Sequence, residues 1–351
     1  MAGHVGSTVV LLFCLGALLP GGCKRSLSSG DAVRATLAAI RPQASLPPAA
    51  EFAPLGDRWN GEDGVPWAAA RSLAQLCKLS YASQAEIDTV LSRWGFGKPS
   101  HFQNGSLYAC LASDEQTVVI AFRGTDDRQD WLVNADATPQ AVLHGTVHRG
   151  FYQGMKTLYP QVAAAATDHK AKQKHLWITG HSLGGALAVA FAYQALAEGT
   201  FKPAGVVTFG QPLLADSALG AYISGQLGGN YVRFVNERDV VTRVPPGYVH
   251  FGKLVWFHEG KVQELDAQRG DSRAAGNPLA GLPPELAPFS PAEFESLQRS
   301  IRDLRQFGRT FDPARLQSYG EQMAAVTDHF MDGYLAGIDA FAGSSPRVAS
   351  R

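Results

Sequence analysis

The chain has 351 residues, of which 45% are hydrophobic and 18% are charged, with 31 basic residues against 31 acidic ones. This composition supplies enough apolar material for a large core, and the balanced charge disfavours a nucleic-acid partner. The sequence holds neither a C-x-x-C pair nor an H-E-x-x-H motif, so no metal and no other cofactor is expected.

An apolar run at the N-terminus, Val9–Leu19, is too short to cross a bilayer as a helix but has the length of a signal-peptide core. It ends in L-P-G-G-C, which resembles the cleavage box of a bacterial lipoprotein, in which Cys23 would carry a lipid. Pro20 is unusual in that box, and no lysine or arginine precedes the run. We predict export, with residues 1–23 as a signal peptide of the secreted or of the lipid-anchored type.

Residues 24–54 are rich in alanine, proline and serine without a sustained period, which predicts a flexible tether. The rest, 55–345, is expected to form one domain. Cys77 falls in a predicted helix of that domain and Cys110 in a predicted strand. In an exported protein the two either form a disulfide or remain buried thiols, and both alternatives stay open.

A serine in the middle of the chain stands between a predicted strand and a predicted helix. Lys174–Thr179 (K-H-L-W-I-T) suits a buried strand, and the alanine-rich segment Gly185–Leu196 suits a helix. Gly180–Gly184 (G-H-S-L-G) joins them. Its glycines permit the sharp turn of a nucleophile elbow, which exposes the hydroxyl of Ser182 and leaves the N–H of Leu183 at a helix start.

A serine nucleophile needs a histidine base and an acid that orients it, in the chain order serine, acid, histidine for this kind of elbow. Ala204–Phe209 and Tyr231–Val235 are predicted strands, and the second leads into Glu237 and Asp239. An acid there lies at the carboxyl edge of the sheet, on the same side as the elbow. Asp239 is the preferred acid, and Glu237 is the alternative.

The candidate bases are the histidines that follow the serine. His181 is excluded, because its side chain diverges from that of the neighbouring serine. His250 and His258 flank the apolar segment Phe251–Phe257, where a histidine is usually structural. His329 lies at or just before a predicted final helix, and its place in the chain does not by itself distinguish a base from a surface residue.

The segment Ala267–Gln317, between the candidate acid and the last histidine, has the character of an insertion. Ser290–Glu293 (S-P-A-E) has the form of a capping box with proline at the first helical position. The apolar residues after it share one helical face: Phe294, Leu297, Ile301 and Leu304. We predict one amphipathic helix, which either caps the site or braces the core.

Six short motifs between about residues 65 and 340 resemble, in order, those of the class 3 lipases, a family of fungal-type triacylglycerol lipases and related esterases. The matching segments are Ala121–Thr125 (A-F-R-G-T), Val147–Phe151 (V-H-R-G-F), Gly180–Gly185 (G-H-S-L-G-G), Phe209–Pro212 (F-G-Q-P), Asn236–Pro246 (N-E-R-D-V-V-T-R-V-P-P) and Asp328–Tyr334 (D-H-F-M-D-G-Y).

This resemblance implies an α/β-hydrolase fold, in which a central, mostly parallel sheet is flanked by helices and a helical insertion, 267–317, precedes the catalytic histidine. It also implies the site residues. These are the catalytic triad Ser182, Asp239 and His329, and the oxyanion hole formed by Thr125 and Leu183.

Thr125 follows a predicted strand, Gln116–Phe122, which would bring it to the same sheet edge as the elbow. Arg123 either contacts substrate or makes a structural ion pair. In fungal-type lipases an apolar helix after this motif covers the site and opens at a lipid surface. Here Asp126–Asn134 (D-D-R-Q-D-W-L-V-N) is short and polar, so a strongly apolar lid is not expected.

The activity that the resemblance implies is hydrolysis of acylglycerols or related lipid esters through an acyl-serine intermediate. One alternative lies within the family, as a phospholipase or an esterase for small or aromatic acyl groups. Another is a catalytically silent, surface-anchored binding protein, although such a protein would not need all five site residues. The expected partners are an ester substrate and a membrane or lipid surface.

Overall fold

The computed structural model describes residues 51–56, 59, 65–125, 138–170, 174–266, 282–306 and 328–342. The predicted signal peptide, the tether up to residue 50, the segment 126–134 and the parts 267–281 and 307–317 of the predicted insertion lie outside them. In the described part of the chain, no helix combines the length and the apolar character needed to cross a membrane.

A single sheet of eight strands, in the order β1-β2-β3-β6-β7-β8-β9-β10, organises the described residues. The strands β3, β6, β7, β8 and β9 pair in parallel, and antiparallel β1, β2 and β10 complete the two edges. The strands are β1 (Ser100–Asn104), β2 (Leu107–Ser113), β3 (Thr117–Phe122), β6 (His175–His181), β7 (Gly205–Phe209), β8 (Tyr231–Asn236), β9 (Lys253–His258) and β10 (Lys261–Asp266). A separate hairpin consists of β4 (Pro139–Val142) and β5 (Gly145–His148).

The central strands are short apolar runs because both of their faces are covered. Every residue of β3 (T-V-V-I-A-F) and of β7 (G-V-V-T-F) is buried. Parallel strands with helices on both sides show this continuous hydrophobic pattern instead of alternation. The four strands predicted for this sheet from the sequence are confirmed, with ends that differ by at most two residues.

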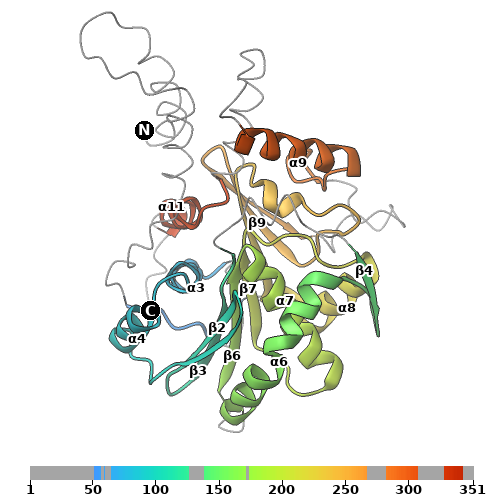
Figure 1. Cartoon of the computed structure of the whole chain (residues 1–351). Coiled ribbons are helices and arrows are strands. Elements are labelled where there is room, and N and C mark those ends of the chain that lie inside the picture. The colour runs from blue at the N-terminus through green and yellow to red at the C-terminus, as the bar shows by residue number, and fades with distance from the viewer. Residues whose placement is uncertain are drawn as a thin grey trace, which may run out of the picture.

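Helices cover both faces of the sheet (Figure 1). One apolar core joins the sheet to α6, α7 and α8, and a second joins it to α3, α4 and α11. The helices are α3 (Trp67–Leu79), α4 (Gln84–Arg93), α6 (Arg149–Lys170), α7 (Leu183–Glu198), α8 (Ser217–Leu227), α9 (Pro291–Gln306) and α11 (Met331–Ala342), with 3₁₀ turns η2 (Gly228–Asn230) and η3 (Val240–Arg243).

The predicted amphipathic helix is α9, and it starts with a complete capping box. The backbone N–H of Ser290 donates to the Glu293 carboxylate over 2.8 Å, and the N–H of Glu293 donates back to the serine hydroxyl over 3.3 Å. Its buried side chains pack on η3, the turn that follows Asp239: Phe294, Leu297 and Ile301 on α9 contact Val240, Val241 and Val244.

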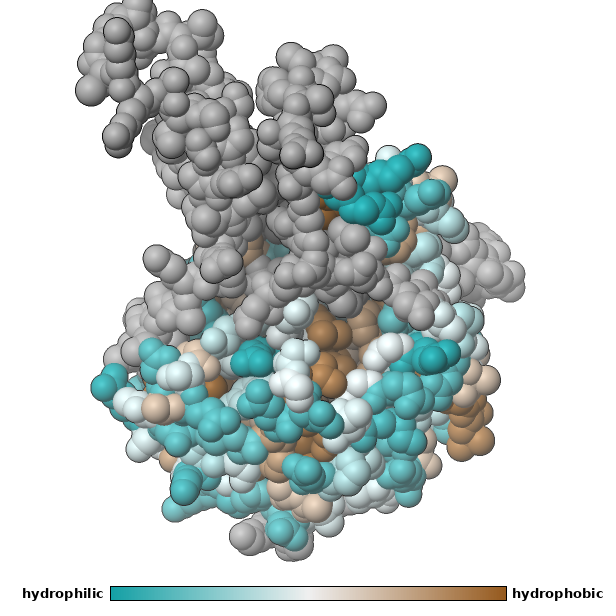
Figure 2. Space-filling view, in the orientation of Figure 1, coloured by the Kyte–Doolittle hydropathy of each residue, from teal (hydrophilic) through white to brown (hydrophobic). Residues whose placement is uncertain are grey.

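The outward face of α9 is hydrophilic (Figure 2), with Glu293, Glu295, Arg299 and Arg302 exposed. Helix α9 therefore packs its apolar face against η3 and turns its charged face toward solvent, as expected of a helix that braces the core. The cap over the site stays a prediction.

Cys77 and Cys110 are free and buried, so the structure has the thiol alternative and not the disulfide. The Cys77 sulfur lies 3.2 Å from the hydroxyl of Thr179. Burial raises the pKa of each thiol to about 12. Because the thiolate is the reactive form, both cysteines are structural.

The packed part of the chain begins slightly before the predicted boundary at residue 55. The ring of Phe52 lies 5.5 Å from that of Trp94 and 4.9 Å from that of Phe96, and the N–H of Ala53 donates to Ser72 over 2.8 Å. These contacts attach the end of the predicted tether to α3 and α4.

Candidate active site

Ser182 lies at the reversal between β6 and α7. Its φ of 59° and ψ of −133° are a strained conformation for a residue with a side chain. A Cβ at Gly180 would overlap the carbonyl group of Gly184, and a Cβ at Gly184 would overlap the carbonyl oxygen of Phe122. Only glycine fits at either position, and this is why the predicted elbow can form here.

The elbow is attached to the neighbouring strand and to the start of a helix. The backbone N–H of Ser182 donates to the carbonyl of Phe209, the last residue of β7, over 3.0 Å. Leu183 is the first residue of α7, where backbone N–H groups have no acceptor within the helix. Its N–H therefore remains available to an oxyanion.

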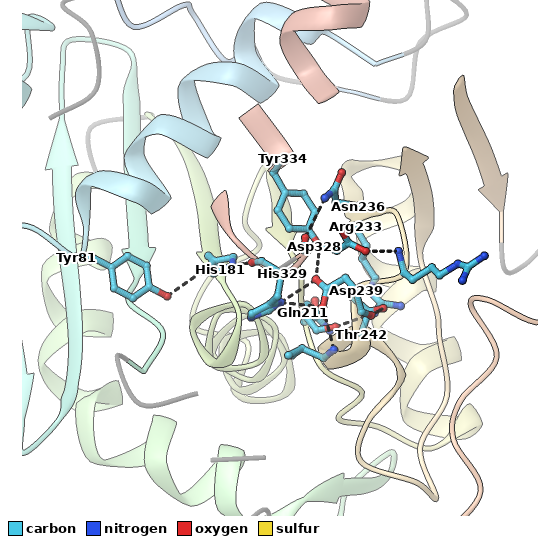
Figure 3. A network of polar contacts seen from close by, with 12 residues as sticks. Tyr81, His181, Gln211, Arg233, Asn236, Asp239, Thr242, Asp328, His329 and Tyr334 are labelled. Carbon is cyan, nitrogen blue, oxygen red and sulfur yellow. Dashed lines mark hydrogen bonds and ion pairs between the residues drawn. The ribbon is translucent and has the colours of Figure 1, made fainter. Parts of the chain in front are cut away.

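His329 and Asp239 form a buried hydrogen-bonded pair (Figure 3). The Nδ1 of His329 lies 2.9 Å from Oδ1 and 2.8 Å from Oδ2 of Asp239, and each residue is only 1% exposed. The N–H of Val241 donates to Oδ1 over 2.9 Å, and the hydroxyl of Tyr334 donates to Oδ2. Since a carboxylate only accepts, Nδ1 carries the proton and Nε2 is left as an acceptor.

The competing acid and histidines have other partners. Glu237 lies 3.2 Å from His258 and accepts from the N–H of Glu259. His250 contacts the guanidinium of Arg233 and the carbonyl of Leu286, and burial together with the adjacent cation holds the pKa of its imidazole well below the ordinary value. The predicted structural character of both histidines agrees with these contacts.

The serine and the histidine–aspartate pair meet at the end of β7. Ser182 binds the carbonyl of Phe209, and a Cβ on the next residue, Gly210, would lie 2.8 Å from both Oδ2 of Asp239 and Nδ1 of His329. The Ser182 Oγ and the His329 Nε2 are buried, and neither has a hydrogen-bond partner among the described residues. The structure thus brings all three predicted triad residues to one edge of the sheet.

The other predicted oxyanion residue approaches from β3. Gly124 packs so closely on the elbow that a Cβ there would lie 3.1 Å from the Cβ of Ser182, and Thr125 is the next residue. Arg123 places its guanidinium 5.1 Å from the centre of the Tyr108 ring and donates to the carbonyl of Ser106 over 3.2 Å. In the described part of the chain it makes no ion pair, and the contact with substrate stays a prediction.

Three contacting residues escaped the interpretation of the sequence. Tyr334 donates to the Asp239 carboxylate, and burial and that carboxylate raise its pKa well above the ordinary value, so it remains a donor. Asp328 accepts from the N–H of Arg238 over 3.2 Å, and Tyr81 binds His181. Tyr334 and Asp328 stand inside a motif already singled out, but the motif does not say which side chain each one contacts.

No group of three or more histidine, cysteine, aspartate or glutamate side chains suited to a metal occurs among the described residues. The polar groups that meet at this edge are a serine hydroxyl, a histidine ring and a carboxylate, which are the groups that a serine hydrolase site on an α/β sheet requires.

Comparison with known proteins agrees with this class. Residues 119–249 match the model of the family described as Lipase (class 3). The Rhizomucor miehei lipase is 30% identical over 168 residues, which are 45% of this chain and 46% of that protein. The secreted mono- and diacylglycerol lipase 1 of Fusarium solani is 29% identical over 166 residues, 45% of this chain and 49% of that protein.

A solved structure of Rhizomucor miehei triacylglyceride lipase aligns with a TM-score of 0.50 and 24% identity, over 55% of this chain and 82% of that chain, and it confirms the predicted α/β fold. The chain is similar to the class 3 lipases over residues 119–249, and to the two fungal lipases named above over less than half of its length. It spans about half the length of the curated relatives it matches.

The substitution Tyr334→Phe tests the hydrogen bond that Tyr334 donates to Asp239. Without it, the carboxylate no longer shares its charge with a phenol and holds the proton on the histidine more strongly. We expect the acid limb of the pH profile of kcat/KM to move toward higher pH, by less than about one unit, because a hydrogen bond to a charged group contributes about 1.5–3 kcal/mol and only part is transmitted.

The matched control is Tyr159→Phe, which removes a hydroxyl bound to Glu198 over 2.8 Å at a contact between α6 and the end of α7. This substitution should leave the acid limb of the pH profile of kcat/KM at its wild-type position. An acid limb that does not move in Tyr334→Phe, or that moves to lower pH, would contradict the role given to this hydroxyl.

Burial raises the pKa of Asp328 from 3.8 to about 6. The hydrogen bond from the N–H of Arg238 opposes this shift, and the negative charge of Asp239 adds to it. The unfolded chain therefore ionises first as the pH rises, and the folded state loses stability between about pH 4 and 6. The isosteric Asp328→Asn variant cannot ionise. The free energy of unfolding of this variant, measured in urea and taken relative to wild type, should rise by on the order of 1 kcal/mol from pH 4.5 to pH 7.5, after allowance for solvent screening. A difference in unfolding free energy that does not change with pH would refute this.

Proposed function

We propose that this chain is a serine carboxylic ester hydrolase that cleaves acylglycerols or related lipid esters through an acyl-Ser182 intermediate. One observation carries the proposal. The buried Nε2 of His329 and Oγ of Ser182 lack hydrogen-bond partners among the described residues, at an edge where Asp239 already holds the other ring nitrogen. Buried polar atoms without partners require an explanation. The two atoms do not bond each other in this structure, and a proton transfer that begins when the ester is bound would give both of them a role.

The polarity of the pair sets the direction of proton transfer. Nδ1 of His329 donates to Asp239, so Nε2 accepts the Ser182 proton while Oγ attacks the ester carbonyl carbon. When the tetrahedral intermediate collapses, the same nitrogen returns the proton to the leaving alcohol. A water molecule then attacks the acyl-serine by the reverse sequence, releasing the carboxylic acid and regenerating the hydroxyl.

The negative charge on the carbonyl oxygen needs donors that are in place before the reaction. The N–H of Leu183 at the start of α7 is one, and the N–H of Thr125, which follows Gly124 beside the elbow, is the other. Each such donor is worth about a hundredfold to a thousandfold in turnover in acyl-transfer enzymes.

The substrate class rests on the relatives and on the surface. The two relatives above are named as a lipase and as a mono- and diacylglycerol lipase. Figure 2 shows apolar residues in the middle of one face of the molecule, next to residues of intermediate hydropathy. Apolar surface of this kind suits acyl chains. A phospholipase, a small-ester or aromatic-ester hydrolase and a catalytically silent binding protein are the outcomes that the assays below separate.

We expect Ser182→Ala to lose about a millionfold in kcat, as triad removal does in serine hydrolases, and to stop covalent labelling by a fluorophosphonate. The matched control is Ser224→Ala. Ser224 is a buried serine on α8 whose hydroxyl also lacks a partner among the described residues, so its removal should leave kcat within about twofold. The measurement is hydrolysis of nitrophenyl esters of graded chain length.

A Ser182→Ala protein that retains most of its activity would reject Ser182 as the nucleophile. The wild type is then assayed on diacylglycerol, triacylglycerol, phosphatidylcholine and short or aromatic esters. A preference for phosphatidylcholine or for the short esters would replace the proposed substrate class. A folded protein inert toward all of them would favour the binding protein.

We also propose that the chain is exported through residues 1–23, because the run Val9–Leu19 has the length of a signal-peptide core and the Fusarium solani relative is named as secreted. Mass spectrometry of protein expressed in a bacterial host should find the first 22 or 23 residues removed, with a lipid-modified Cys23 if the lipoprotein box is used. Cys23→Ala is the control for the lipid. An unprocessed chain would contradict export.

A further inference from the structure

His181, the residue before the elbow serine, has a geometry that its exclusion as a base does not explain. It is fully buried at the end of β6. Its Nε2 lies 2.8 Å from the backbone carbonyl oxygen of His329, and its Nδ1 lies 2.9 Å from the hydroxyl of Tyr81 (Figure 3). We propose that His181 is a positioning residue that holds the backbone of His329 and thereby sets the place of the base relative to Ser182.

The directions of its hydrogen bonds show which nitrogen of the His181 ring carries a proton. A carbonyl oxygen can only accept, so Nε2 of His181 carries a proton and donates to His329. In the neutral ring Nδ1 then accepts from the Tyr81 hydroxyl. The His181 and His329 rings stack with centroids 4.7 Å apart and planes 29° apart. Because His329 becomes cationic during each acyl transfer, a second cation stacked on it would be unfavourable, and the neutral form of His181 suits this neighbour.

The contact fixes the base at a point that Asp239 does not reach. Asp239 binds Nδ1 of the His329 side chain, whereas His181 binds its main chain. A third contact, from the side-chain amide of Asn236 to the carbonyl of Asp328 over 2.9 Å, holds the preceding peptide. Because both the backbone and the ring of His329 are held, the direction of its Nε2 is fixed as well. Since His181 is covalently adjacent to Ser182, the nucleophile and the base share one short connection.

Tyr81 extends the connection to Arg123–Thr125, the segment after β3, which we call the oxyanion loop because it carries the predicted donor Thr125. Its hydroxyl packs against Gly124, where an added Cβ would overlap it and would also approach the Cβ of Ser182. Tyr81 follows α3, and α3 is tied to α11 by ion pairs between Arg71 and Asp339 and between Lys78 and Asp332. One chain of contacts therefore links the oxyanion loop, the elbow and the segment that carries the base.

The inference rests on the proposed function, and two variants with side chains of similar length test it. Glutamine has a side-chain N–H that can replace Nε2 of histidine, whereas methionine has a similar length and no donor. We expect His181→Met to lower kcat for nitrophenyl esters about a hundredfold with KM within about twofold, since a displacement of about 1 Å costs that much. His181→Gln should stay within about tenfold of wild type. Tyr81→Phe should lose about threefold.

The matched control is His144→Gln. His144 stacks on Tyr222 at the tip of the β4–β5 hairpin and should leave kcat unchanged. Equal losses in His181→Met and His181→Gln, or a wild-type kcat in His181→Met, would overturn the proposal. Should His181→Met not fold, a kcat more than about tenfold below wild type in folded His181→Gln would overturn it as well.

A second readout separates this inference from the proposed function. The proton on Nδ1 of His329, bound to a carboxylate, should give a far-downfield resonance in proton NMR. We expect it in wild type, in Ser182→Ala and in His181→Gln, and broadened by exchange in His181→Met. A wild type inert to every ester would refute the function and leave this test in place, whereas an unchanged resonance in His181→Met would refute the positioning role alone.

Discussion

The site depends on one backbone reversal, the positive φ of Ser182 between a central strand and a helix. A non-glycine residue in such a conformation costs about 1–3 kcal/mol and persists only where its surroundings enforce it. Here β6 pairs with β3 on one side and β7 on the other, and Gly180 and Gly184 let the turn close against them. Because the sheet holds this strained backbone, the Cα–Cβ bond of Ser182 has a fixed direction before substrate arrives.

Parallel pairing explains why residues far apart in the chain surround that hydroxyl. The strands β3, β6, β7 and β8 all end at one edge, so the residues that follow them share it. Thr125 follows β3 and Ser182 follows β6, and Asp239 comes after β8. His329 belongs to no strand, so pairing does not place it. Contacts from Asp239, Asn236 and His181 do so instead.

Local patterns explain what could be predicted from the sequence. The strands and the elbow are visible because apolar runs and flanking glycines are local features, and the capping box of α9 is visible for the same reason. Asp239 could be ranked above Glu237 from its position after a strand. His329 emerged only from the family resemblance. Tyr81 did not emerge at all, and Tyr334 emerged only as a member of a motif without an assigned contact, because a hydrogen bond to a distant element leaves no periodicity.

Asp239 shows how the central sheet and the helix α9 contribute differently to the candidate site. A buried carboxylate is unfavourable unless donors surround it, and Asp239 accepts from Val241, His329 and Tyr334. The N–H of Val241 reaches it because η3 turns there. The buried side of α9 packs on that turn. The strands therefore place Ser182, whereas a helix outside the sheet helps to keep Asp239 within reach of its donors. Changes in α9 would act on the proposed catalysis through the geometry of Asp239 without touching the serine.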